Sequence, residues 1–248
     1  MNNEYSRRDF LAMASVPAAI WAKRPLHHPK EISLDGATFD IIRNKGAARR
    51  YLLIHGDEET ARQVLTGHIE SHRGTAFLIR NHTRDVEIDG GKLDPNRMFS
   101  RPGAEANLRK LNPDWTEAQL TEALDLLDQG RGRLLDALFP PDNGLLLALH
   151  NNTEGYSVED EIELSDTRSM AEPNNPHAFF LCTDPDDYKI MAKSPYNVVQ
   201  EKFVRASDDG SLSRRAAASY IRYVNLEVRM GETARQKEML DWAEKHLP

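Results

Sequence analysis

The chain lacks a pair of cysteines, an apolar run long enough to span a membrane, and an excess of basic residues. Its 248 residues include a single cysteine, Cys182, so no disulfide can form within the chain, and the apolar run around this thiol predicts a buried core residue. The apolar run 11–21 is shorter than the ~20 residues that a membrane span requires. The formal net charge is -7, whereas nucleic-acid binders usually present a basic surface. We therefore expect neither a stable membrane span nor a nucleic-acid partner.

A Gly-x-Ser-x-Gly motif is also absent. That motif carries the nucleophile of serine hydrolases with an α/β fold, so its absence argues against a hydrolase that works without a metal. No internal repeat or low-complexity segment stands out, and the length suits one α/β domain with a substantial core.

The beginning of the chain has the features of a targeting segment. Residues 6–11, Ser-Arg-Arg-Asp-Phe-Leu, resemble the twin-arginine export signal, and a short apolar stretch follows them. We expect an export signal over 1–22, a linker over 23–33 and one domain over 34–248. The resemblance implies the twin-arginine translocation machinery as a partner and a periplasmic or secreted location.

Strand-like and helix-like segments alternate along this domain. Short apolar runs predict strands, and longer amphipathic runs predict helices. The strands are expected at 38–42, 50–55, 75–80, 145–150, 178–182 and 221–228, and the helices at 59–71, 116–138 and 233–247. This order favours a single α/β domain with a mixed, mostly parallel twisted sheet flanked by helices.

Two predicted strands end in histidine. His55 closes one apolar run and is followed three residues later by Glu58, and His150 closes another. Ligand sites of open α/β sheets lie at the carboxyl ends of the strands. Imidazole and carboxylate are zinc ligands, and a catalytic zinc site uses three of them. A His with a Glu three residues later is common by chance, so the pairing with the second strand end carries the hypothesis.

Three blocks together resemble the zinc carboxypeptidase superfamily, nearest its succinylglutamate desuccinylase and aspartoacylase branch. The blocks are 55–58 (His-Gly-Asp-Glu), 94–99 (Asp-Pro-Asn-Arg-Met-Phe) and 149–153 (Leu-His-Asn-Asn-Thr). The resemblance implies the fold of that superfamily and one Zn²⁺ per chain, held by His55, Glu58 and His150. It further implies that Asn96 and Arg97 grip a substrate carboxylate, a role that suits the planar guanidinium fork.

The family also places a glutamate near the end of its catalytic domain, where it acts on the attacking water. Glu227 is the corresponding residue in Tyr-Val-Asn-Leu-Glu-Val-Arg (223–229), and strand alternation puts it on the face opposite Val224 and Val228, away from the core. An ordinary solvated glutamate is the alternative interpretation. Arg84 is the candidate that polarises the carbonyl, with Arg80 as the second choice.

Many relatives close a loop tyrosine over the substrate. Tyr196, in a proline-containing stretch, is the corresponding candidate here, in competition with Tyr188, Tyr220 and Tyr223. A tyrosine in such a loop is more often a packing residue than a catalytic donor.

These observations predict an exported zinc metallocarboxypeptidase or amidohydrolase. Its substrate would be a small peptide or an N-acyl amino acid that bears a carboxylate, and it would hydrolyse an amide bond. The alternative is a catalytically inactive periplasmic protein of the same fold that binds carboxylates or peptides.

Overall fold

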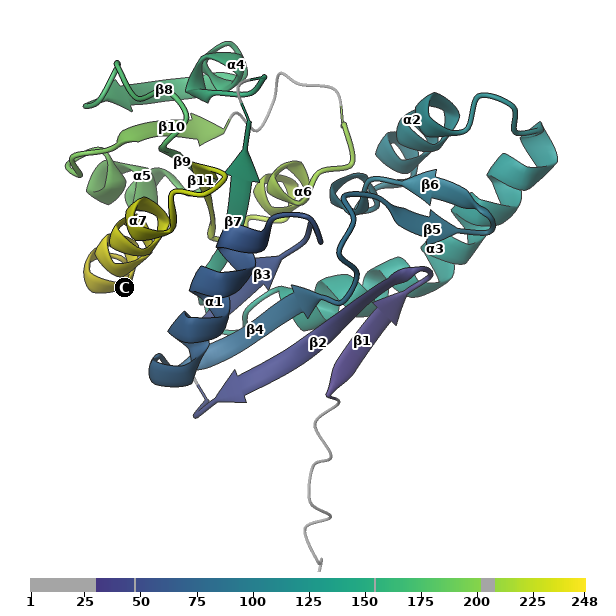
Figure 1. Ribbon diagram of the computed structural model, residues 1–248, viewed down its shortest axis with the longest axis horizontal. Helices are drawn as coiled ribbons and strands as arrows, with labels where there is room; N and C mark the ends of the chain where they lie inside the picture. Colours follow the sequence, from purple (N-terminus) through teal and green to yellow (C-terminus); the bar gives the residue numbers. More distant parts are fainter. Residues whose placement is uncertain (1–29, 47, 154, 202–207) are drawn as a thin grey trace, which may run out of the picture.

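One twisted nine-stranded sheet organises the computed structural model, which describes residues 30–46, 48–153, 155–201 and 208–248 (Figure 1). Its strand order is β1-β2-β4-β3-β7-β11-β9-β10-β8. The strands are β1 (Glu31–Leu34), β2 (Ala37–Asn44), β3 (Arg50–Leu53), β4 (Gly74–Ile79), β7 (Leu146–Asn152), β8 (Ser165–Met170), β9 (Phe179–Cys182), β10 (Asn197–Glu201) and β11 (Tyr223–Arg229). The central strands β4, β3, β7 and β11 pair in parallel.

The antiparallel pairings lie toward the two edges of the sheet. They join β1 to β2, β2 to β4, β11 to β9 and β10 to β8, while β9 and β10 pair in parallel. Six of the nine strands (β1, β3, β4, β7, β8 and β11) consequently run in one direction. The expected α/β domain with a mixed, mostly parallel twisted sheet is confirmed.

Helices cover both faces of the sheet (Figure 1). They are α1 (Glu59–Ser71), α2 (Arg101–Leu111), α3 (Glu117–Leu138), α4 (Val158–Ile162), α5 (Pro185–Met191), α6 (Leu212–Ala218) and α7 (Thr233–His246), with a single 3₁₀ turn η1 (Pro95–Arg97). A capping box between Thr116 and Gln119 begins α3. A small hairpin of β5 (Val86–Ile88) and β6 (Gly91–Leu93) packs beside α2, outside the main sheet.

The two faces of the sheet form two separate hydrophobic cores. Leu52 of β3 packs into the core shared with α2, α3 and α6, whereas its neighbour Leu53 packs into the core shared with α1, α5 and α7. A central strand that is covered on both faces has to be apolar along its whole length. This explains why β7 begins as an unbroken apolar run and why the polar residues at its end are conspicuous.

The segments expected from sequence agree with the observed elements within a few residues. β1 begins at Glu31, inside the segment 23–33 that was expected to be a linker. The export signal expected at 1–22 lies outside the described residues. In the part of the chain that is described, no helix is both long enough and apolar enough to cross a membrane.

Candidate metal centre and its cavity

The three expected ligands meet at the carboxyl edge of the central strands. His55 follows β3, Glu58 stands immediately before α1, and His150 lies in β7. β3 and β7 are parallel neighbours, with Leu52 paired to Ala148, so both histidines come to the same edge. Gly56 makes the tight turn between the ligands possible, because a Cβ there would lie 2.3 Å from the backbone oxygen of Asn81.

The ligand atoms are already close enough to share one ion. His55 Nδ1 lies 2.8 Å from Glu58 Oε1, and His150 Nδ1 lies 3.3 Å from Glu58 Oε2. One ligand atom from each residue lies within 4.8 Å of the others, and all three side chains are buried. Two atoms bound to the same zinc ion at ~2.1 Å are at most ~4.2 Å apart, so a small adjustment completes the site.

A buried oxygen of Glu58 is also suitably placed to bind a cation. Glu58 Oε2 is shielded from solvent and accepts no well-aligned hydrogen bond from a described residue; His150 Nδ1 lies 3.3 Å from it. A buried carboxylate oxygen without a partner is costly, and a metal ion supplies the missing interaction. Two imidazoles and one carboxylate match the donor set of a catalytic divalent site. His55, Glu58 and His150 can therefore bind a metal.

In the absence of a metal ion, the pKa values of His55 and Glu58 are shifted by their mutual contact. Burial disfavours the charged form of His55, but the carboxylates of Glu58 and Asp94 outweigh it and raise the pKa of His55 to about 9. Burial likewise opposes ionisation of Glu58, while His150 and His55 more than compensate and lower its pKa to about 2. A metal ion that binds here competes with a proton on His55.

Asp94 contacts the imidazole nitrogen of His55 that faces away from Glu58. No role was predicted for Asp94 from the sequence. Its Oδ1 lies 2.9 Å from His55 Nε2 and accepts the backbone N–H of Asn96 at 2.8 Å. His55 and Arg84 outweigh burial and lower the pKa of this carboxyl. Metal-binding histidines commonly direct their second nitrogen to such a carboxylate. The sequence did contain a sign of this role, because Asp94 is the first residue of the block that also contains Asn96 and Arg97.

Glu227 stands directly beside the third ligand. β11 and β7 are parallel, and their register pairs Glu227 with His150, so both side chains project from the same face. Glu227 was expected to point away from the core; it points into a cavity instead of into open solvent and is buried. Burial and the charge of Glu58 raise its pKa, against the opposing effect of His150.

Two amides hold the Glu227 carboxylate in place, and neither was foreseen. Asn225 donates to Oε1 at 3.1 Å, and Asn152 donates to Oε2 at 3.2 Å. Asn225 precedes Glu227 by two residues on one strand, and Asn152 follows His150 by two on the other, so alternation alone could have placed them on this face. The carboxylate is therefore fixed next to the metal ligands.

The two arginine candidates for polarising the carbonyl lie in different places. Arg84 lines the cavity, 3.6 Å from Glu58 Oε1 and 3.4 Å from Asp94 Oδ2. Arg80 instead forms exposed ion pairs with Glu31 and Asp40 at 2.6 Å each. The structure therefore brings the first choice to the site and leaves the second on the surface.

Asn96 and Arg97 also line the cavity. Asn96 Oδ1 accepts the backbone N–H of Leu212 at 3.0 Å, which leaves the amide N–H₂ group as the donor it offers to a ligand. Arg97 donates to the backbone oxygen of Asn96 at 2.8 Å and lies 3.8 Å from Asp209. Gly210 permits the close approach of this segment, because a Cβ there would meet the Arg97 oxygen at 2.3 Å and its φ is +78°.

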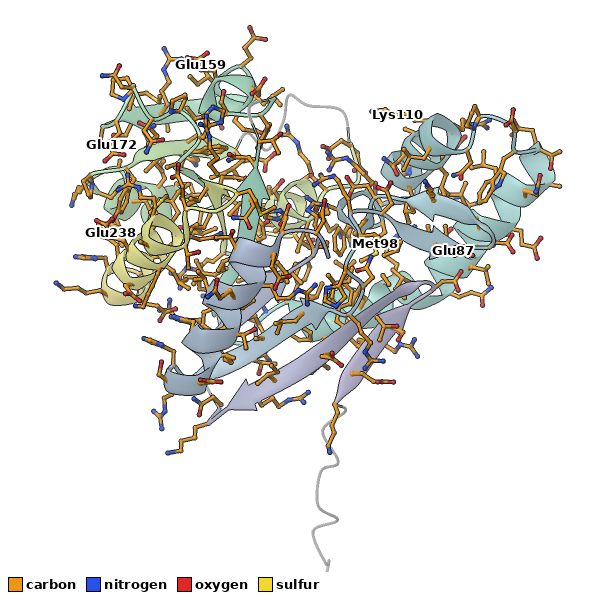
Figure 2. The ribbon with its side chains drawn as sticks, viewed as in Figure 1. Glu87, Met98, Lys110, Glu159, Glu172 and Glu238 are labelled. Carbon is orange, nitrogen blue, oxygen red and sulfur yellow. The ribbon has the colours of Figure 1, made fainter. Side chains whose placement is uncertain are left out.

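Tyr196 is not brought to the site. Its ring is buried in the opposite core, 5.6 Å from the Phe180 ring and 6.2 Å from the Trp242 ring. Arg235 covers it at 4.6 Å and pairs with glutamates that Figure 2 shows at the periphery of the molecule, Glu172 and Glu238. Tyr196 is therefore a packing residue, which is the more common role of a tyrosine in a proline-containing loop.

Other tyrosines occupy the place that Tyr196 was expected to take. Of the competitors, Tyr223 lines the cavity, whereas Tyr188 lies 3.2 Å from Thr167 and Tyr220 is exposed. Tyr156, which sequence reasoning overlooked, also lines the cavity and donates to Glu161 at 2.6 Å.

The cavity that these residues enclose has a volume of about 500 Å³, within the usual range for a small-molecule site. Its lining includes a buried ion pair between Arg214 and Glu201 at 2.6 Å. A polar ligand with charged groups therefore suits it better than an apolar one.

Comparison with known proteins adds little to this geometry. No family model and no curated protein matches the chain. A solved structure from Shewanella baltica OS155, provisionally described as a metallopeptidase, is 13% identical; the match covers 87% of this chain and 85% of that one with a TM-score of 0.44. A likeness this weak carries no argument about function, which rests on the site itself.

Proposed function

We propose that this chain is a zinc-dependent metallohydrolase that binds one Zn²⁺ through His55, Glu58 and His150. The observation that carries the proposal is the position of Glu227. A buried carboxylate with a raised pKa stands in register with a metal ligand, and two amides hold it there. Perturbed carboxylates beside a metal-binding cluster are typical of hydrolytic sites.

The proposed reaction is hydrolysis of an amide bond. When bound, zinc would polarise the scissile carbonyl and increase the acidity of the attacking water. Glu227 takes the proton of that water and later gives it to the leaving nitrogen, a role for which a raised pKa is suited. Asn152 and Asn225 keep its two oxygens in position throughout. Arg84 donates to the oxyanion that develops on the carbonyl.

The proposed substrate is a small peptide or an N-acyl amino acid with a free carboxylate. Arg97 offers a guanidinium fork, and Asn96 has only its amide donors left, because its oxygen is already bonded to Leu212. Donors without acceptors suit an anionic group. This arrangement supports a carboxypeptidase or N-acyl amino acid deacylase. Its proposed place of action, in the periplasm or outside the cell after twin-arginine export, rests only on residues 6–11 of the sequence.

The test begins with the metal content of the purified mature chain, measured by mass spectrometry beside His55→Ala and His150→Ala. We expect each variant to lose one zinc equivalent. Peptides and N-acyl amino acids are then screened for amide hydrolysis with the wild type and with Glu227→Gln. Zinc retained without hydrolysis of any carboxylate-bearing amide favours a binding protein, and equal metal content in all three proteins overturns the proposal.

A further inference from the structure

A second group of metal-ligating side chains lies where α1 packs against α7 (Figure 1). It consists of His68 and His72 at the end of α1 and Asp241 of α7. One ligand atom from each lies within 4.8 Å of the others. The described residues around the cavity do not include any of the three, so this cluster is separate from the proposed active site.

His68 is held as metal-binding histidines commonly are. Its ring is buried, and its Nε2 makes no hydrogen bond with any described residue, although Glu244 Oε1 lies 3.5 Å away. Glu244 is itself fixed, since it accepts from Tyr51 Oη at 2.9 Å and from Arg49 at 3.4 Å. A carboxylate beside a ligating histidine restrains its ring and raises its basicity.

His72 and Asp241 complete the cluster from the solvent side. The His72 ring stacks on His68, with 3.8 Å between centroids and 4° between planes. Residues four apart lie on one helical face, so two histidines at this spacing can chelate one ion. Asp241 is half-buried and pairs with the exposed Lys237 one turn away. A cation at the cluster replaces that lysine as the partner of Asp241.

An ion at this cluster requires the two stacked imidazole rings to turn, because a metal lies in the plane of each imidazole that binds it and these planes are now nearly parallel. The distances themselves need only a small change. Two ligand atoms bound to one zinc ion are at most ~4.2 Å apart, so the atoms of this cluster have to approach by less than ~1 Å. His72 and Asp241 are both partly exposed. His72 Nδ1 lies 3.0 Å from Ser71 Oγ and 3.1 Å from the backbone oxygen of His68, so Nε2 is the nitrogen that His72 offers to an ion. Buried His68 with Glu244 behind it supplies the fixed point.

We propose that His68, His72 and Asp241 form a second site for a divalent transition metal such as zinc, with water in the remaining coordination position. The ion ties the end of α1 to α7 and so holds together the helical layer on this face of the sheet. Because α1 starts directly after Glu58, the same helix then connects two metal centres.

Calorimetric titration with ZnCl₂ tests this site in four full-length proteins: wild type, His55→Ala, His72→Ala and the double variant. His82→Ala, an exposed histidine outside both clusters, is the matched control. We expect two zinc equivalents for wild type and the control, one for each single variant and none for the double variant. Asp241→Asn should weaken the His55-independent equivalent about tenfold or more, because it removes an anionic ligand.

Thermal unfolding gives an independent readout. In the His55→Ala protein, zinc at about 100 times Kd should raise Tm by about 5–10 °C, and the added His72→Ala change should abolish that rise. The proposal is overturned if His55→Ala binds no zinc or if His72→Ala leaves the stoichiometry unchanged. Failure of the active-site proposal looks different: zinc is then lost with His72→Ala but kept with His55→Ala.

Discussion

Replacing Asp94 by Asn tests whether the residue behind His55 sets the affinity of the metal centre. The change keeps the shape of the side chain and an acceptor for the Asn96 N–H, but it removes the negative charge 2.9 Å from His55 Nε2. A charge-assisted hydrogen bond is roughly twice as strong as a neutral one. Loss of such a partner typically weakens metal binding by about 10–100-fold, or about 1.4–2.7 kcal/mol.

Proton competition makes this loss depend on pH. In the metal-free protein, Glu58 and Asp94 raise the pKa of His55 to about 9, so at pH 7 zinc has to displace a proton. Without the Asp94 charge, the pKa of His55 falls and that displacement becomes easier. Part of the lost affinity is thereby recovered at pH 7 but not at pH 9. The difference between variant and wild type should accordingly grow as the pH rises.

The assay is zinc affinity by competition with a chelator at pH 7 and pH 9. Asp114→Asn serves as the control, because Asp114 is exposed and is not among the residues described around the cavity. Equal affinities for Asp94→Asn and wild type at pH 9 would refute the reasoning. A loss that is larger at pH 7 than at pH 9 would refute the assignment of the proton to His55.

Three further predictions concern the proposed reaction. Glu227→Gln should lower kcat by about 10²–10⁴-fold while zinc is retained, because proton transfer is lost and the ligands remain; steady-state kinetics and metal analysis on one sample check this. Arg84→Ala should lower kcat by about 100-fold or more, and Arg80→Ala, which removes only surface ion pairs, should not change it. Arg97→Lys should raise KM about tenfold with little change in kcat, since lysine cannot make a two-pronged contact; an unchanged KM for a carboxylate-bearing substrate would count against Arg97 as its anchor.

The cluster of His55, Glu58 and His150 was predictable because its signals are local. His55 and His150 each end an apolar run, and parallel strands deliver such residues to one edge of a sheet. Helix boundaries such as those of α1 and α3 also follow from nearby residues, as in the capping box of Thr116. Some local signals were missed, such as the Ser100 cap that begins α2.

The remaining features depend on contacts between distant segments. Asn152 faces Glu227 only because β7 and β11 are neighbours with a particular register, and that pairing is not written in either strand. Tyr196 immediately precedes β10, and its ring packs against Phe180 and Trp242 from elsewhere in the chain. Residues in the antiparallel edge of the sheet, such as β8, lacked the apolar runs by which strands are recognised.

The distribution of the metal ligands along the chain fixes the order of events during synthesis. Glu58 and His150 are 92 positions apart, and Glu227 lies on a strand that is made later still. Because β7 lies between β3 and β11, Glu227 joins the other three groups only when β11 pairs with β7. A nascent chain that still lacks β11 can therefore bring His55, Glu58 and His150 together through the pairing of β3 with β7 but has no Glu227 beside them. Assembly of the whole site waits for β11, the last strand of the described chain, to leave the ribosome.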